Sequence, residues 1–149
     1  MSLATVASNS LISQTWQNLY SIINSNVSDP KSRGVQWVFA AWPQSRKGTA
    51  DVYPCITIDS PDMRGQNVTM GQSKRMYTWT IPISISDTRM DTVDGLAGTV
   101  IYTIESNKGS LEANGMNMFN PEATPTFHNL NNKQIIHQKN INVRFEGYV

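Results

Sequence analysis

The chain has 149 residues, a length typical of one domain, and a formal charge of +1. Only 15% of its residues are charged and 39% are hydrophobic, which argues against a disordered acidic chain and against nucleic-acid binding through bulk charge. No apolar run is long enough to span a membrane, and the first residues lack the pattern of a secretory signal, so we expect neither. The single cysteine excludes an internal disulfide and a multi-cysteine metal site. A polar but weakly charged surface favours protein–protein assembly.

The first third of the chain predicts one helix followed by two strands. Apolar residues at helical spacing predict an amphipathic helix over Ser10–Asn26, with its first residue as the N-cap. The aromatic and β-branched run Val35–Trp42 predicts a buried strand, and Tyr53–Asp59 predicts a second strand. Because only a polar loop with a cationic tip at Arg46 and Lys47 separates the two strands, we expect them to form a hairpin.

A long loop and a strongly patterned strand come next. Ser60–Ser73 contains Pro, Gly and Met without a sustained period, which predicts a long functional loop. Over Tyr77–Ile85, apolar and polar residues alternate strictly, as they do in a half-buried strand. Pro82 cannot donate a ladder hydrogen bond, so we expect this strand to lie at an edge or to carry a bulge.

The last third predicts a second helix and two further strands. The helix begins near Asp87 and Thr88, in a variant capping box, and ends near Asn107. Leu111–Pro125 is expected to be a loop. A short strand over Thr124–Leu130 and a long closing strand over 135–149 complete the chain.

This order of elements, α-β-β-β-α-β-β, predicts a single α+β domain over residues 1–149. Its antiparallel or mixed sheet should hold about four to five strands, with both helices packed on one face. The apolar positions of the helices and of the alternating strand should form one core. The predicted core residues are Trp16, Leu19, Ile23, Trp79, Ile81, Ile83, Val100 and Ile104.

Few residue types that carry chemistry occur in a recognisable pattern. Cys55 follows a proline inside a predicted strand, where a small apolar filler is the usual role. His128 and His137 would lie near each other only if both belong to the last hairpin, and we interpret them as surface or interface histidines. Asp87, Asp91 and Asp94 cluster at the start of the second helix, where capping and the helix dipole explain them. No phosphate-binding glycine motif is present either. Because none of these residue types forms a recognisable site, we expect no catalytic, cofactor or metal site.

Five basic residues lie on or near the predicted loops. Solvated loop charge is their ordinary interpretation, and a cationic rim that faces a partner or lines a passage for DNA is the alternative. These residues are Arg46, Lys47, Arg64, Lys74 and Arg75.

The order of the elements resembles that of a known family over almost the whole chain. A Y-P-x-I-x-I strand at Tyr53–Ile58 precedes a long loop and the alternating strand Trp79–Ile85. A helix started by Met and Asp follows, and the terminal strand carries R-x-E at Arg144–Glu146. In this it resembles the tail terminator, or tail-completion, proteins of long-tailed phages and related archaeal viruses. That family has no catalytic residue to transfer onto this chain.

The resemblance implies a non-enzymatic virion protein, assembled in the host cytoplasm, that acts without a cofactor. It would form a hexameric ring that caps the tail tube, stops its polymerisation and contacts the head connector, with DNA passing through the lumen. The methionines of the long loop suit an interface with several partners, and Leu111–Pro125 would be an added contact element or a lineage-specific insertion. The candidate interface residues are Met63, Arg64, Met70, Arg46, Lys47 and Arg75.

Other interpretations of the sequence remain open. Another neck or tail-tube component would share the same class of ring-forming fold. A small enzyme could use Cys55 with His128 or His137, and a monomeric domain could bind a ligand on the concave face of its sheet. A ring or tube would favour a tail terminator or another neck or tail-tube component, and a strict monomer would favour the enzyme or the ligand-binding domain.

Overall fold

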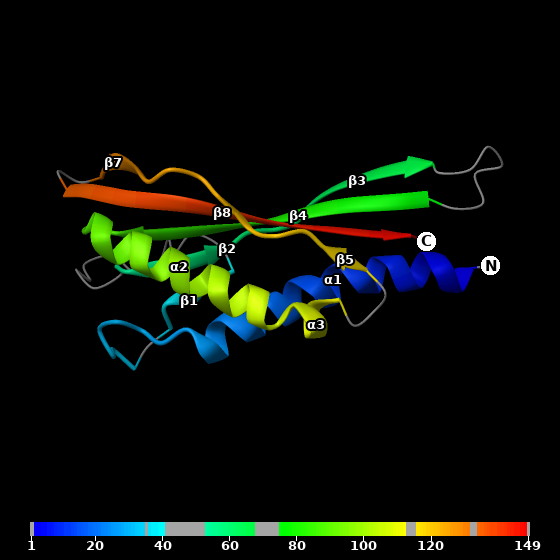
Figure 1. The fold of residues 1–149 in the computed structure, drawn as a ribbon, viewed down its shortest axis with the longest axis horizontal. Coiled ribbons are helices and arrows are strands. Elements are labelled where there is room, and N and C mark those ends of the chain that lie inside the picture. Colours follow the sequence, from blue (N-terminus) through cyan, green and yellow to red (C-terminus); the bar gives the residue numbers. More distant parts are fainter. Residues whose placement is uncertain are drawn as a thin grey trace.

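The computed structural model describes residues 2–34, 36–40, 53–67, 75–112, 116–131 and 134–148. In these ranges the chain forms an α+β fold in which two main helices pack against one face of a mixed sheet (Figure 1), as the sequence predicts. Several short elements join those that were predicted. In chain order the elements are α1 (Ser2–Asn26), β1 (Val38–Phe39), β2 (Cys55–Ile58), β3 (Asp62–Asn67), β4 (Arg75–Asp87), α2 (Met90–Ser106), α3 (Lys108–Leu111), β5 (Asn117–Met118), β6 (Glu122–Ala123), β7 (Phe127–Asn131) and β8 (Gln134–Tyr148).

The long antiparallel pair β4 and β8 forms the centre of the sheet. The two strands pair without interruption from Met76 opposite Tyr148 to Asp87 opposite His137. Strands β2 and β3 pair in succession with the edge of β4 that faces away from β8. Strands β5, β6 and β7 pair with the edge of β8 that faces away from β4. The sheet is therefore elongated, with the β3–β4 hairpin at one end and the β7–β8 hairpin at the other (Figure 1).

The predicted hairpin between the first two strands is wrong. Val38 of β1 pairs with Ile56 of β2 in parallel. The prediction took the polar segment between the strands as a tight turn, whereas a parallel pair needs a crossover connection of a dozen or more residues. Residues 40–54 are long enough to supply one. Arg46 and Lys47 lie outside the described residues.

The long loop predicted over Ser60–Ser73 is also wrong in its first half. Asp62–Asn67 is strand β3, which pairs with β4 from Asp62 opposite Thr80 to Asn67 opposite Arg75. An edge strand is held by backbone hydrogen bonds on one side and needs no apolar alternation, so the periodicity gave no sign of it. Residues 68–74, which include Met70, lie outside the described part of the chain.

The limits of the helices differ from the prediction. The first helix begins at Ser2, so the proposed N-cap lies inside it. The second begins after Arg89, with no side-chain capping bond, which makes the predicted capping box at Thr88 wrong. Asp87 instead ends strand β4 and is buried. Helical periodicity locates the middle of a helix better than its ends, because the terminal turns can extend past the apolar stripe.

The segment predicted as a loop over Leu111–Pro125 holds short regular elements. Strands β5 and β6 each pair with β8 over two residues, and Thr124 donates its amide hydrogen to the carbonyl oxygen of Asn140 at 2.9 Å. The strand predicted from Thr124 begins instead at Phe127. Two-residue strands are too short for a period to show in the sequence.

Pro82 does not mark an edge strand, because β4 has neighbours on both sides. Strand β2 ends opposite Ile83, strand β3 begins opposite Thr80, and Pro82 faces the junction between them. Its carbonyl oxygen accepts a hydrogen bond from Asp59 at 3.0 Å. Proline has no N–H to donate, and at this position an N–H would point at the gap between β2 and β3, where no paired strand residue could accept it.

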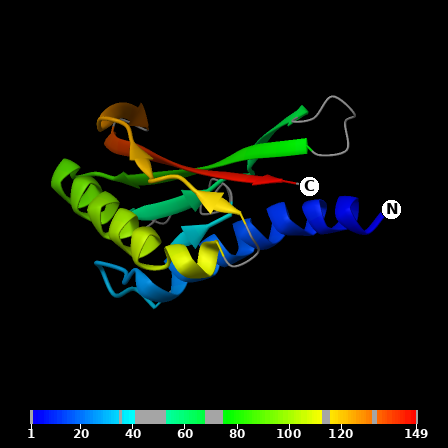
Figure 2. The same ribbon diagram turned by 45° about the vertical axis from the view of Figure 1, so that its right-hand side comes forward.

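The predicted core is confirmed. Helices α1 and α2 lie beneath the sheet (Figure 2), and their buried residues form one cluster with those of β4 and β8. Trp79 stacks on Phe145 with ring centroids 6.0 Å apart. Of the predicted residues only Trp16 is partly exposed, and its indole nitrogen donates to the carbonyl oxygen of Asp59 at 2.9 Å. This core fixes the positions of the sheet ends that carry the candidate sites.

Candidate functional site

The structure gathers three of the six predicted interface residues on one hairpin. Met63 and Arg64 lie on β3 and Arg75 begins β4, so all three belong to the β3–β4 hairpin. The side chain of Met63 is 48% exposed. Arg46, Lys47 and Met70 fall outside the described residues.

The opposite end of the sheet carries exposed apolar side chains that the sequence analysis missed. Leu130 of β7 and Ile135 of β8 are direct cross-strand partners, and they are 74% and 53% exposed. Phe127, at the start of the same strand, is 39% exposed. We call Leu130 and Ile135 the apolar tip. Ile136 directly follows Ile135, and two polar residues separate Phe127 from Leu130, so no alternating pattern marked this exposed pair in the sequence.

A polar cluster fastens the β7–β8 hairpin to helix α2. The Asp94 carboxylate accepts hydrogen bonds from the hydroxyl of Thr126 and from Nζ of Lys139, the latter at 3.3 Å. The hydrogen bond from Thr126 contributes most to lowering the pKa of Asp94. The hydrogen bond from Lys139 and the positive charge of that residue lower it further. Besides its predicted role at the start of α2, Asp94 therefore connects the helix to the β7–β8 hairpin through its side chain.

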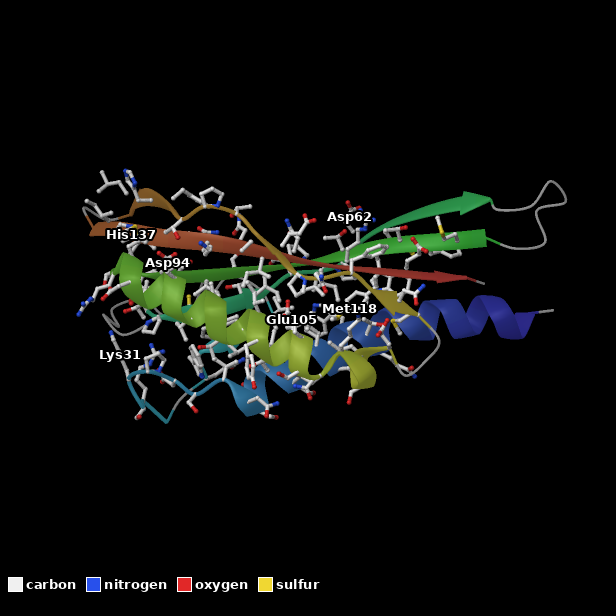
Figure 3. The ribbon with its side chains drawn as sticks, in the orientation of Figure 1. Lys31, Asp62, Asp94, Glu105, Met118 and His137 are labelled. Carbon is white, nitrogen blue, oxygen red and sulfur yellow. The ribbon has the colours of Figure 1, made fainter. Side chains whose placement is uncertain are left out.

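Two histidines lie between this cluster and the apolar tip. His128 of β7 pairs with His137 of β8, and their ring centroids are 6.3 Å apart at an interplanar angle of 58°. Asp87 of β4 lies opposite His137 on the other side of β8. Partners in register share a face of the sheet, so the carboxylate and the two imidazoles form a row across three strands. Figure 3 labels His137 and Asp94 at this end of the molecule.

The single thiol lies in an apolar setting. Cys55 is fully buried among Tyr53, Phe39 and Ile136. Burial raises its pKa to about 12, and the charge of Arg33 opposes this only in part. The thiol therefore stays protonated at neutral pH, and the filler role inferred from the sequence fits its surroundings.

A cavity of about 300 Å³ opens on the face of the sheet that the helices leave uncovered. The Arg144 guanidinium lies 4.2 Å from the centroid of the Phe119 ring, within range of a cation–π contact. Polar side chains from β4, β6 and β8 complete the wall. The lining residues are Thr80, Phe119, Asn120, Glu122, Asn142 and Arg144.

The described ranges contain no group of three or more His, Cys, Asp or Glu side chains that could hold a metal ion. Their helices also include none that is both long and apolar enough to cross a membrane. No protein-family model matches the chain, and no curated protein shows a significant sequence match.

Proposed function

We propose that this chain is a structural virion protein that caps the end of a viral tail tube as a ring and joins it to the head connector. The observation that carries the proposal is the apolar tip. Leu130 and Ile135 face each other across a hairpin and keep more than half of their surface exposed. Adjacent exposed apolar residues commonly mark a surface that a partner covers.

The position of this surface favours assembly into a ring. The apolar tip lies at the β7–β8 end of the elongated sheet, and the exposed Met63 lies at the start of β3, opposite Trp79 of β4 and well away from the tip. Two different and well-separated surfaces on one subunit allow head-to-tail contacts, which close into a ring when the rotation between subunits permits. Methionine adapts its shape to a partner, so Met63 suits an interface.

The composition supports the same proposal. Few charged groups must be desolvated when large surfaces are buried between subunits. In this assembly the tail tube protein and the head connector protein occupy the two faces of the ring, and the mature protein resides in the tail or neck of the virion. Basic side chains that line the lumen would contact DNA without sequence preference.

The test is to replace Leu130 by Glu and to compare this variant with Leu130→Met, which keeps an apolar side chain of similar size. Light scattering coupled to size-exclusion chromatography, with and without tail tubes, measures assembly, and electron microscopy shows whether tube ends are capped. We expect the Glu variant to unfold like the parent, because the site is exposed, but to lose rings or capping. Rings and capped tubes at parental levels in the Glu variant would contradict the proposed interface.

A second candidate function is supported by the cavity on the uncovered face of the sheet. Its amide, hydroxyl, guanidinium and carboxylate groups beside one aromatic ring suit a small polar ligand, as expected of a monomeric ligand-binding domain. A protein that stays monomeric at all concentrations and in the presence of tail tubes would favour this alternative. Tubes that lengthen instead of ending would favour a tail-tube component.

A further inference from the structure

We propose that His128 and His137 form a two-histidine site for a divalent transition metal ion, with Zn²⁺ as the reference ion. The two side chains project from directly paired positions of β7 and β8, on the same face of the hairpin. His128 is exposed and His137 is half-buried, so an ion can reach both rings from solvent. Imidazole nitrogen is a preferred ligand of zinc, copper and nickel.

The distance between the rings fits this proposal after a small rotation. Two imidazole nitrogens bound to one tetrahedral zinc ion at about 2.0–2.1 Å place the ring centroids roughly 5 Å apart. The observed separation is 6.3 Å. A side-chain rotation of the exposed His128 can close the remaining gap of about 1 Å, because exposed side chains change rotamer readily. The backbone hydrogen bonds of the hairpin can stay as they are.

The surrounding charges favour a cation. Asp87 lies opposite His137 on β4, and Asp94 faces the same histidine from helix α2. Lys139 is the cation beside them, and it is held by Asp94. At the start of α2, Arg89 and Asp91 pair with each other and cancel. The described charged groups around the histidines therefore sum to a negative charge, which attracts a metal ion.

Asp87 occupies the place of an orienting carboxylate. Metal-bound histidines usually donate their second ring N–H to a carboxylate or a carbonyl oxygen, which fixes the tautomer and the ring direction. Asp87 is 3% exposed and follows His137 in the row across the sheet. We assign it as a positioning residue for His137, outside the set of metal ligands.

Two protein ligands leave further coordination positions open. Water fills these positions in the free protein, and a donor atom from a bound molecule can replace water. The site lies next to the apolar tip, so such a donor would come from whatever covers Leu130 and Ile135. Metal binding by the free chain is independent of the proposed role in tail termination, and each proposal can fail without the other.

The test uses the full chain without a histidine tag. Isothermal titration with Zn²⁺ at neutral pH measures affinity, and Mg²⁺ serves as the control ion because it prefers oxygen ligands. We expect saturable binding of one Zn²⁺ per chain, a thermal midpoint that rises with Zn²⁺ concentration, and no response to Mg²⁺. His128→Gln and His137→Gln should each weaken Zn²⁺ binding by about tenfold or more.

Unchanged Zn²⁺ affinity in both glutamine variants, or the absence of saturable binding to the parent, would overturn the proposal. Thermal unfolding without metal checks that each variant is folded. For Asp87 the variant is Asp87→Asn, with nitrogen NMR of the His137 ring as the readout. A changed tautomer balance together with weaker Zn²⁺ binding supports the positioning role, and an unchanged tautomer balance removes Asp87 from the site.

Discussion

Replacing Ile83 by Ala tests whether the strand pattern sets the core in the way the structure shows. Ile83 is fully buried at the centre of β4, between Ile58 of β2 and Ile141 of β8. The substitution removes side-chain carbons worth about 0.8 kcal/mol each on burial, or about 2.4 kcal/mol in all. The neighbours are fixed in strands and can collapse only partly, so a cavity term raises the expected loss to about 3–4 kcal/mol.

Urea unfolding followed by tryptophan fluorescence measures this loss as a lower midpoint at an unchanged slope. Ile135→Ala is the matched control, because the same side chain is 53% exposed there. It should change the free energy of unfolding by less than about 0.5 kcal/mol. Protein concentration must be held constant, since assembly would add to the apparent stability. A loss below about 0.5 kcal/mol for Ile83→Ala would show that this strand faces the other way.

Three further predictions concern other parts of the chain. Burial raises the pKa of Cys55 to about 12, so stability should fall as the pH rises from about 9 towards 12. Cys55→Ala should remove the part of this stability loss that is due to the thiol, and should leave assembly intact. Urea unfolding at about pH 8 and about pH 10.5 measures the loss in free energy of unfolding, and equal losses in the parent and the variant would contradict the prediction. Burial opposes ionisation of Asp29, but hydrogen bonds from Arg33 and the backbone outweigh it and lower the pKa of Asp29, so this stabilising effect is present at neutral pH and lost in acid. Asp29→Asn should cost about 1–3 kcal/mol near pH 7 and less near pH 3, and a cost that does not depend on pH would refute the ion pair. Replacing residues 68–74 by Asn-Gly joins β3 to β4 through a two-residue turn and should leave unfolding nearly unchanged but abolish ring formation or docking to tail tubes, because it removes Met70. Assembly at parental levels, measured by light scattering, would exclude that segment from the interface.

The sequence predicted the parts of the fold that depend on burial. Strand β4 alternates strictly because one of its faces packs on the helices, and α2 has a clear apolar stripe for the same reason. Strand β3 and the short strands along β8 were missed because backbone pairing at an edge leaves no such pattern. The parallel direction of β1 could not be read from loop length alone. Direction and register depend on contacts between distant segments.

The candidate sites were less predictable than the core. The spacing of His128 and His137 fits no standard metal motif, and only the register of the hairpin brings their rings within 6.3 Å. Asp87 looked like a helix cap because it precedes α2 by a few residues, whereas β4 extends through it. Such sites arise from pairing across strands and have no signature in local sequence.

The continuous ladder between β4 and β8 has a mechanical consequence. Strand β4 leads away from the β3–β4 hairpin at one end of the molecule, and β8 leads away from the β7–β8 hairpin at the other (Figure 1). A force that pulls these two hairpins apart therefore slides β4 and β8 along each other. Their hydrogen bonds are perpendicular to that force, so the whole ladder from Met76 to Asp87 shares the load at once. The fold should resist stretching along its long axis far better than peeling from either edge.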